Sequence, residues 1–150
     1  MVLLDSNILI RWVEPTDPDH PLVEVALDWL TRSGTVFCYT SQNLSEFWNA
    51  CTRPTNRKGF GLRPSEADRR ARSFEARLQL LPNSIAVHQE WRKMLVDYGL
   101  CGVQVHDARL AAAMRVHGVK RILTFNTSDF ARFPDLQAMH PGNIQAGPQP

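Results

Sequence analysis

The stretch VLLDSNILI, residues 2–10, decides the fold of this chain. It opens with the short apolar run Val2–Leu4, which is typical of a buried strand, and then stops at the polar triplet Asp5–Asn7. Such a triplet favours turns and helix caps, so the stretch predicts a strand, a carboxylate and a helix in that order. In open α/β sheets, ligands bind beyond the carboxyl ends of the strands, where Asp5 would stand. Taken alone, Asp5 is more simply explained as a helix cap worth about 1 kcal/mol.

Length and composition indicate one globular domain. The chain has 150 residues, of which 43% are hydrophobic and 21% charged, enough to bury a core. It shows neither a signal-like start nor a run approaching the ~20 apolar residues of a membrane span, so we expect a cytoplasmic protein. Its three cysteines suit buried thiols better than disulfides or a zinc site. The net charge of +2 leaves nucleic-acid binding open. We expect the domain to span residues 1–140, followed by a loosely ordered tail over 141–150.

Strand-like runs alternate with helical patterns along the whole chain. Beyond the first strand, the strand-like runs are 35–39, 78–81, 119–125 and 136–139. The main helical patterns between them are 21–33, 41–53, 65–78, 84–98 and 106–117. Such alternation predicts a parallel sheet with helices on both faces, and hence an α/β fold.

Four carboxylates are expected to meet at one edge of that sheet. Strand-to-helix junctions gather at a single edge of a parallel sheet, and Asp5, Glu46 and Asp129 each follow a strand-like run. Asp107 begins a helix that would enter the same edge. Individually, Glu46 could be a surface residue, Asp107 a first-turn residue favoured by the helix dipole, and Asp129 part of a turn. Together they would repel one another unless a cation joined them.

An all-oxygen set of ligands without Cys or His suits Mg²⁺ or Mn²⁺ rather than zinc. Such an ion could hold a phosphate oxygen, lower the pKa of an attacking water and stabilise the leaving oxygen. These are the requirements of phosphodiester hydrolysis, so the acidic edge favours a metal-dependent nuclease.

The segments around the four acids resemble the motifs of the PIN domain. They are LLDSNILI at 3–10, SEFWNA at 45–50, VHDARLAAAM at 105–114 and LTFNTSDF at 123–130, in order and over nearly the whole chain. The chain most resembles the single-domain VapC-like toxins of bacterial type II toxin–antitoxin pairs. That resemblance implies a three-layer α/β/α fold with a five-stranded parallel sheet and Mg²⁺-dependent endoribonuclease activity. It also implies a homodimer and inhibition by a small cognate antitoxin.

The resemblance also assigns roles at the acidic edge. Carried onto this chain, it implies that Asp5 and Asp107 are the principal metal ligands. Glu46 and Asp129 would complete the site, and Mn²⁺ could substitute for Mg²⁺. Asn126 is polar as well, and we assign it a supporting hydrogen bond.

Three further features lie near these motifs. Ser6 would donate a hydrogen bond that orients a carboxylate, although it could equally be a simple helix cap. His106 neighbours Asp107 and is more simply explained as structural or solvent-exposed. The segment RPTNRKGFGLRP, residues 53–64, predicts a mobile basic loop that could contact RNA phosphates. The candidates for those contacts are Arg53, Arg57, Lys58 and Arg63.

These observations favour hydrolysis of RNA by a water that attacks phosphorus in line and expels the 3′ oxygen. Two alternatives remain at this point. One is a PIN-fold module that binds RNA or regulates without catalysis. The other is a phosphatase of the haloacid dehalogenase type, which would need a second Asp where this chain has Asn7. That phosphatase would also need a lysine near the phosphate, and none of the chain's lysines is expected at the acidic edge.

Overall fold

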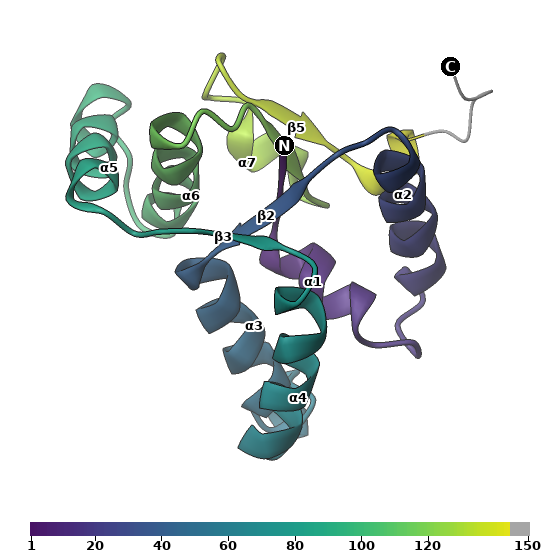
Figure 1. Cartoon of the computed structure of the whole chain (residues 1–150). Coiled ribbons are helices and arrows are strands. Elements are labelled where there is room, and N and C mark those ends of the chain that lie inside the picture. The colour runs from purple at the N-terminus through teal and green to yellow at the C-terminus, as the bar shows by residue number, and fades with distance from the viewer. Residues whose placement is uncertain (145–150) are drawn as a thin grey trace.

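A parallel five-stranded sheet forms the centre of the computed structural model, which describes residues 1–144 (Figure 1). Its strands lie in the order β3-β2-β1-β4-β5, and every neighbouring pair is parallel. The strands are β1 (Val2–Leu4), β2 (Phe37–Thr40), β3 (Gln79–Leu81), β4 (Arg121–Leu123) and β5 (Gln137–Met139). The three-layer α/β/α architecture expected from the sequence is confirmed.

The helices cover both faces of the sheet. They are α1 (Ser6–Trp12), α2 (His20–Arg32), α3 (Ser41–Thr52), α4 (Pro64–Glu75), α5 (Ile85–Asp97), α6 (Gln104–Val116) and α7 (Thr127–Phe130). Two short 3-10 helices, η1 (Thr55–Arg57) and η2 (Pro141–Asn143), lie in connecting segments. In Figure 1, α5, α6 and α7 lie to one side of the sheet, while α1 to α4 occupy the other. No helix in the described part of the chain is long and apolar enough to cross a membrane.

The alternation of side chains along β1 separates the two cores. Val2 and Leu4 point into the core formed with α1 to α4, whereas Leu3 points into the core formed with α5, α6 and α7. All three are fully buried, which is why the run is continuously apolar. Because β1 is the middle strand, the residue that follows it stands at the centre of the carboxyl edge.

The segment between α3 and α4, residues 53–64, for which the sequence predicts a mobile loop, is held to the end of α3 by hydrogen bonds. The backbone N–H groups of Phe60 and Leu62 donate to the carbonyls of Ala50 and Cys51, at 3.0 and 2.9 Å. The Arg53 guanidinium folds back and donates to the Lys58 carbonyl at 3.1 Å. These bonds close the loop onto the end of α3, so its shape is fixed by the chain itself.

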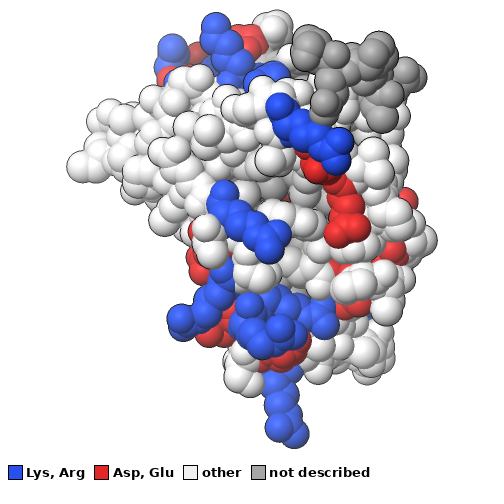
Figure 2. Space-filling model, turned by 45° about the vertical axis from the view of Figure 1, so that its right-hand side comes forward, with Lys and Arg blue, Asp and Glu red and all other residues white. Residues whose placement is uncertain are grey.

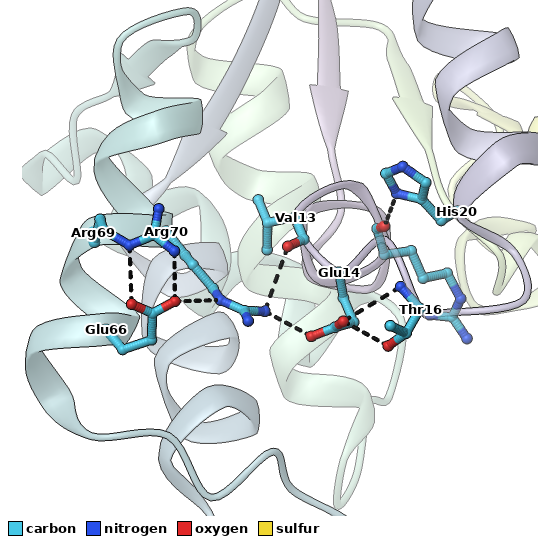
Figure 3. A network of polar contacts seen from close by, with 8 residues as sticks. Val13, Glu14, Thr16, His20, Glu66, Arg69 and Arg70 are labelled. Carbon is cyan, nitrogen blue, oxygen red and sulfur yellow. Dashed lines mark hydrogen bonds and ion pairs between the residues drawn. The ribbon is translucent and has the colours of Figure 1, made fainter.

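A polar network ties α4 to the segment between α1 and α2 (Figure 3). Arg70 on α4 bonds Glu14 at 2.7 Å and Glu66 at 3.1 Å, and Glu66 also bonds Arg69. Thr16 and Arg70 together lower the pKa of the Glu14 carboxyl. In the lower part of the face shown in Figure 2, Lys and Arg side chains lie against Asp and Glu side chains. The positive charge of α4 is therefore largely neutralised within the domain.

The ordered domain continues past residue 140, where we expected it to end. Pro141–Asn143 form η2, in which His140 Nδ1 accepts a hydrogen bond from the Gly142 N–H at 3.0 Å. Pro141 is buried, and Ile144 packs against the core that includes α2. The expected tail thus begins too early at 141, because a buried proline anchors this turn. Residues 145–150 of that tail lie outside the described part of the chain.

Candidate active site

Asp5 is held at the end of β1 by bonds to both of its carboxylate oxygens. Oδ1 accepts from the Ser6 backbone N–H at 2.7 Å, which caps α1. Oδ2 accepts from Thr124 Oγ1 at 2.6 Å and from Asn7 Nδ2 at 2.8 Å. Only 7% of Asp5 is exposed. Burial raises its pKa, and the neighbouring Glu46 adds to this, against the hydrogen bonds from Thr124 and Ser6. Asp5 is therefore a helix cap and a fixed, buried carboxylate at once.

Asn7 and Thr124 support Asp5, and the sequence pattern did not assign either of them a role. Asn7 Nδ2 also donates to Thr124 Oγ1 at 3.1 Å, and Asn7 Oδ1 accepts from the Phe125 N–H at 3.2 Å. Together they clamp the ends of β1 and β4, which are neighbours in the sheet. The available signal was that Thr124 follows β4 as Asp5 follows β1.

The supporting hydrogen bond assigned to Asn126 is not made by its side chain in the described part of the chain. Instead, the Asn126 backbone N–H donates to Thr124 Oγ1 at 3.0 Å. The supporting amide is that of Asn7, which stands two residues after Asp5 in the first turn of α1 and donates to its Oδ2. Asn126 still precedes α7 and directs the chain toward Asp129.

Ser6 lies between two carboxylates, as the sequence predicted for a residue that orients an acid. Its hydroxyl stands 2.6 Å from Glu46 Oε2 and 3.2 Å from Asp5 Oδ1. One hydroxyl carries a single proton, so it donates to one of these oxygens at a time. Ser6 therefore couples the carboxylate at the end of β1 to the one on the second turn of α3.

Gln42 is a further site residue that the sequence pattern did not reveal. Its Nε2 donates to Glu46 Oε1 at 2.9 Å and to the His106 carbonyl at 3.0 Å. This amide joins α3 to the first turn of α6, and so fixes the two helices that carry Glu46 and Asp107. The His106 side chain itself is exposed, in agreement with the simpler explanation.

Asp107 and Asp129 complete the acidic edge from α6 and α7. Burial raises the pKa of Asp107 to about 6, with further contributions from Asp129, Asp5 and Glu46. The positive charge of Arg132 opposes this rise in the pKa of Asp107. Within residues 1–144, neither the Asp107 nor the Asp129 side chain has a hydrogen-bond or ion-pair partner. The charges of Asp5, Glu46 and Asp129 thus all act on Asp107 at this edge of the sheet.

The donor set is compatible with a hard divalent cation. The oxygens are carboxylates and hydroxyls, and the electrostatic strain at Asp107 is of the kind that a cation relieves. No three Asp, Glu, His or Cys side chains in the described residues are close enough to form a ready-made metal group. Mg²⁺ commonly binds through one or two carboxylates and keeps several waters, so such a group is not required.

The basic loop is not part of this cluster. Glu46 is the sixth of the 12 residues of α3, and residues 53–64 follow the end of that helix (Figure 1). Twelve helical residues span about 18 Å, so the loop that carries Arg57, Lys58 and Arg63 begins about 18 Å from the carboxyl edge and about 9 Å along the helix axis from Glu46. These side chains are exposed, while Arg53 is half-buried. Their contact with RNA stays a prediction.

Comparison with known proteins identifies the family of this chain. The family model described as "PIN domain" matches residues 2–136. A comparison with curated protein sequences finds no match.

Solved toxin–antitoxin structures share this fold. VapBC2 from Rickettsia felis, bound to a DNA fragment from its promoter, has 17% identity and a TM-score of 0.68, covering 93% of this chain and 98% of that one. DNA-bound VapBC from Salmonella typhimurium has 20% identity and a TM-score of 0.66, covering 94% and 99%. VapC20 of Mycobacterium tuberculosis, described as a sarcin-ricin loop cleaving toxin, has 16% identity and a TM-score of 0.58, covering 81% and 87%. At these identities the likeness establishes the fold.

Proposed function

Because this chain belongs to the PIN domain family, we propose that it is a metal-dependent endoribonuclease and the toxin of a type II toxin–antitoxin pair. The observation that carries the proposal is the convergence of Asp5, Glu46, Asp107 and Asp129 at the carboxyl edge of the sheet. The fold it shares with VapBC proteins, and with a toxin described as cleaving the sarcin-ricin loop, supports the same function.

The roles of the residues follow from their surroundings. Asp5 and Asp107 would hold Mg²⁺ or Mn²⁺, which when bound supplies a positive charge to a phosphate oxygen and activates water. Ser6, Asn7 and Thr124 keep the Asp5 carboxylate in one orientation. Their bonds thereby limit the reorganisation needed when substrate arrives.

Glu46 and Asp129 are the remaining acceptors, and one of them would orient the attacking water. In-line attack on phosphorus forms one P–O bond and breaks the bond to the 3′ oxygen, leaving a 5′ phosphate on the downstream fragment. No side chain forms a covalent bond with the substrate in this scheme.

The two alternative functions make different demands on these residues. A haloacid dehalogenase phosphatase requires a second Asp two residues after the first, whereas Asn7 occupies that position and bonds Asp5. A module that only binds RNA would not need the acids, and it would tolerate their replacement by amides. RNA cleavage that depends on the acids therefore separates catalysis from binding alone.

The proposed partner is a small cognate antitoxin, and we propose that the toxin acts as a homodimer. This rests on the likeness to VapBC assemblies, of which the structure from Salmonella typhimurium is one. A basic side chain from the antitoxin could enter the acidic edge and displace the cation.

Induced expression in a bacterial host tests the toxin assignment. We expect growth arrest within a few generations, accompanied by loss of specific RNAs, and no arrest from Asp5→Asn, which keeps the shape of the side chain. Co-expression of the small open reading frame next to the gene should restore growth. Equal growth of cells expressing wild type and Asp5→Asn, with intact RNA in both, would refute the toxin assignment. Growth arrest by both proteins would refute it too.

A further inference from the structure

A groove between α5 and α6 lies next to the acidic edge and has no role in the chemistry described above. It encloses about 350 Å³ and is lined by Asn83, Ser84, His88, Trp91 and Arg109, among others. Its walls come from the segment after β3, from the first two turns of α5, and from the middle of α6. Figure 1 shows α5 and α6 side by side at the end of the sheet where β3 forms the edge.

The groove communicates with the acidic site through Gln42. A narrower crevice shares Asn83 and Arg109 with the groove and is lined at its other end by Ser41 and Gln42. Gln42 donates to Glu46, so the crevice begins where the acidic cluster ends. The groove and the acidic cluster are therefore neighbours on the surface, separated by Gln42 and a crevice of about 10 Å³.

The side chains in the groove suit a nucleotide. Trp91 is fixed by a 2.9 Å hydrogen bond from its Nε1 to the Val105 carbonyl. The Arg109 guanidinium lies 5.9 Å from the centre of the Trp91 ring, and the exposed His88 ring meets the same indole edge-on at 6.0 Å. An aromatic surface beside a cation is the combination with which proteins bind single-stranded nucleic acid.

Arg109 carries a positive charge that lies over the ring of Trp91 and is not paired with a carboxylate in the described residues. In the described residues it forms neither an ion pair nor a hydrogen bond. Arg115 on the same helix provides the contrast, because it bonds Glu90 at 3.0 Å and Asp135 at 2.6 Å. The charge of Arg115 is thus neutralised by two carboxylates of the domain, whereas the charge of Arg109 could bind a phosphate.

The order of the sheet places cations on both sides of the acids. Arg132 follows α7, on the side of β4 and β5, and the groove with Arg109 lies on the side of β2 and β3. The carboxylates between them would repel a phosphate backbone, so an RNA strand needs positive charge on either flank. We propose that the groove binds the RNA nucleotide next to the cleaved bond. Arg109 contacts its phosphate, and His88 and Trp91 pack against its base.

This inference rests on the proposed ribonuclease function. Two variants that each remove one positive charge test it, one inside the groove and one outside it. Arg109→Ala removes the cation in the groove. Arg92→Ala removes an exposed cation from α5 that does not line the groove, and serves as the control. Both are made in the active protein for kinetics. Both are also made in an Asp5→Asn background, so that binding of a fluorescein-labelled single-stranded RNA can be measured without cleavage.

We expect Arg109→Ala to weaken binding of the labelled RNA about tenfold and to lower the salt dependence by about one phosphate contact. In the active protein, KM should rise by a similar factor while kcat changes little, because the groove holds substrate and transition state alike. Arg109→Lys should recover part of the binding, and Arg92→Ala should bind like its parent.

Equal binding and KM for Arg109→Ala and Arg92→Ala, in a protein whose wild type cleaves RNA, would overturn the assignment of the groove. Loss of binding accompanied by dissociation of a dimer would also overturn it, since the groove would then be a subunit interface. Absence of RNA cleavage by the wild type would instead count against the proposed function itself.

Discussion

Asp107→Asn is expected to slow RNA cleavage about a thousandfold, while raising the melting temperature of the protein. Asparagine keeps the size of the side chain but removes the charge that would hold the cation. A loss of about 4 kcal/mol of transition-state stabilisation corresponds to this change in rate. Single-turnover cleavage of labelled RNA measures it, and thermal denaturation of the same samples measures stability.

The gain in stability follows from the direction of the pKa shift. The pKa of Asp107 is raised from 3.8 to about 6 in the folded protein, chiefly by burial. Its ionised form therefore costs stability, and this cost develops as the pH rises from about 4 to about 6 and is complete above that. Because the side chain is only half-buried, solvent reduces the effect to about 1 kcal/mol, or roughly 2–4 °C in a domain of this size.

The control for Asp107→Asn is Asp97→Asn, which makes the same replacement at an exposed residue at the end of α5. It should leave both cleavage and melting temperature unchanged. The difference in melting temperature between Asp107→Asn and wild type should widen between pH 4 and pH 7. Wild-type activity in Asp107→Asn, or a melting temperature that falls at neutral pH, would contradict the role given to Asp107.

Phe74→Ala is expected to destabilise the domain by about 3–5 kcal/mol. Phe74 on α4 is 1% exposed, and its ring meets those of Phe47 and Tyr39 edge-to-face at 5.1 and 5.8 Å. Removing it leaves a cavity where α4 packs against α3 and β2. Since small domains are stable by only about 5–15 kcal/mol, the variant should be largely lost on modest heating.

Urea denaturation of wild type, Phe74→Ala and Phe74→Leu measures this effect. The leucine variant fills most of the volume and should retain a large part of the stability. Phe74 packs against Phe47, which directly follows the site residue Glu46 in α3. Unfolding of this cluster should therefore also disrupt the site, and activity should fall in parallel with the folded fraction. A change in unfolding free energy below about 1 kcal/mol for Phe74→Ala would show that α4 does not depend on this cluster.

The sequence predicted the acidic edge because the relevant information is local. The change from Val2–Leu4 to Asp5–Asn7 is read from nine consecutive residues, and parallel strands bring such junctions to one edge. The sequence alone leaves open whether Asp5 is only a helix cap or also a member of the acidic cluster. The structure shows that the cap and the cluster use the same carboxylate, with Oδ1 on the helix and Oδ2 on Thr124.

The supporting residues could not be predicted, because they depend on which strands are neighbours. Thr124 reaches Asp5 only because β4 pairs with β1, and Gln42 reaches the His106 carbonyl only because α6 packs near the start of α3. The partner of each contact is far away in the sequence, and the position of Thr124 directly after β4 is the one local sign of either contact. The position of the basic loop relative to the acids was not predictable either, since it depends on the direction of α3.

Cleavage of RNA by the purified protein, with and without a divalent cation, tests the central claim most directly. A single-stranded RNA labelled at one end is incubated with wild type or Asp5→Asn, in Mg²⁺, in EDTA, and in EDTA followed by excess Mg²⁺. The account predicts fragments with 5′ phosphate ends for wild type in Mg²⁺, none in EDTA, and recovery when Mg²⁺ is restored. Asp5→Asn should yield almost none. Cleavage by wild type in EDTA at an undiminished rate, or by Asp5→Asn as fast as by wild type, would contradict the account.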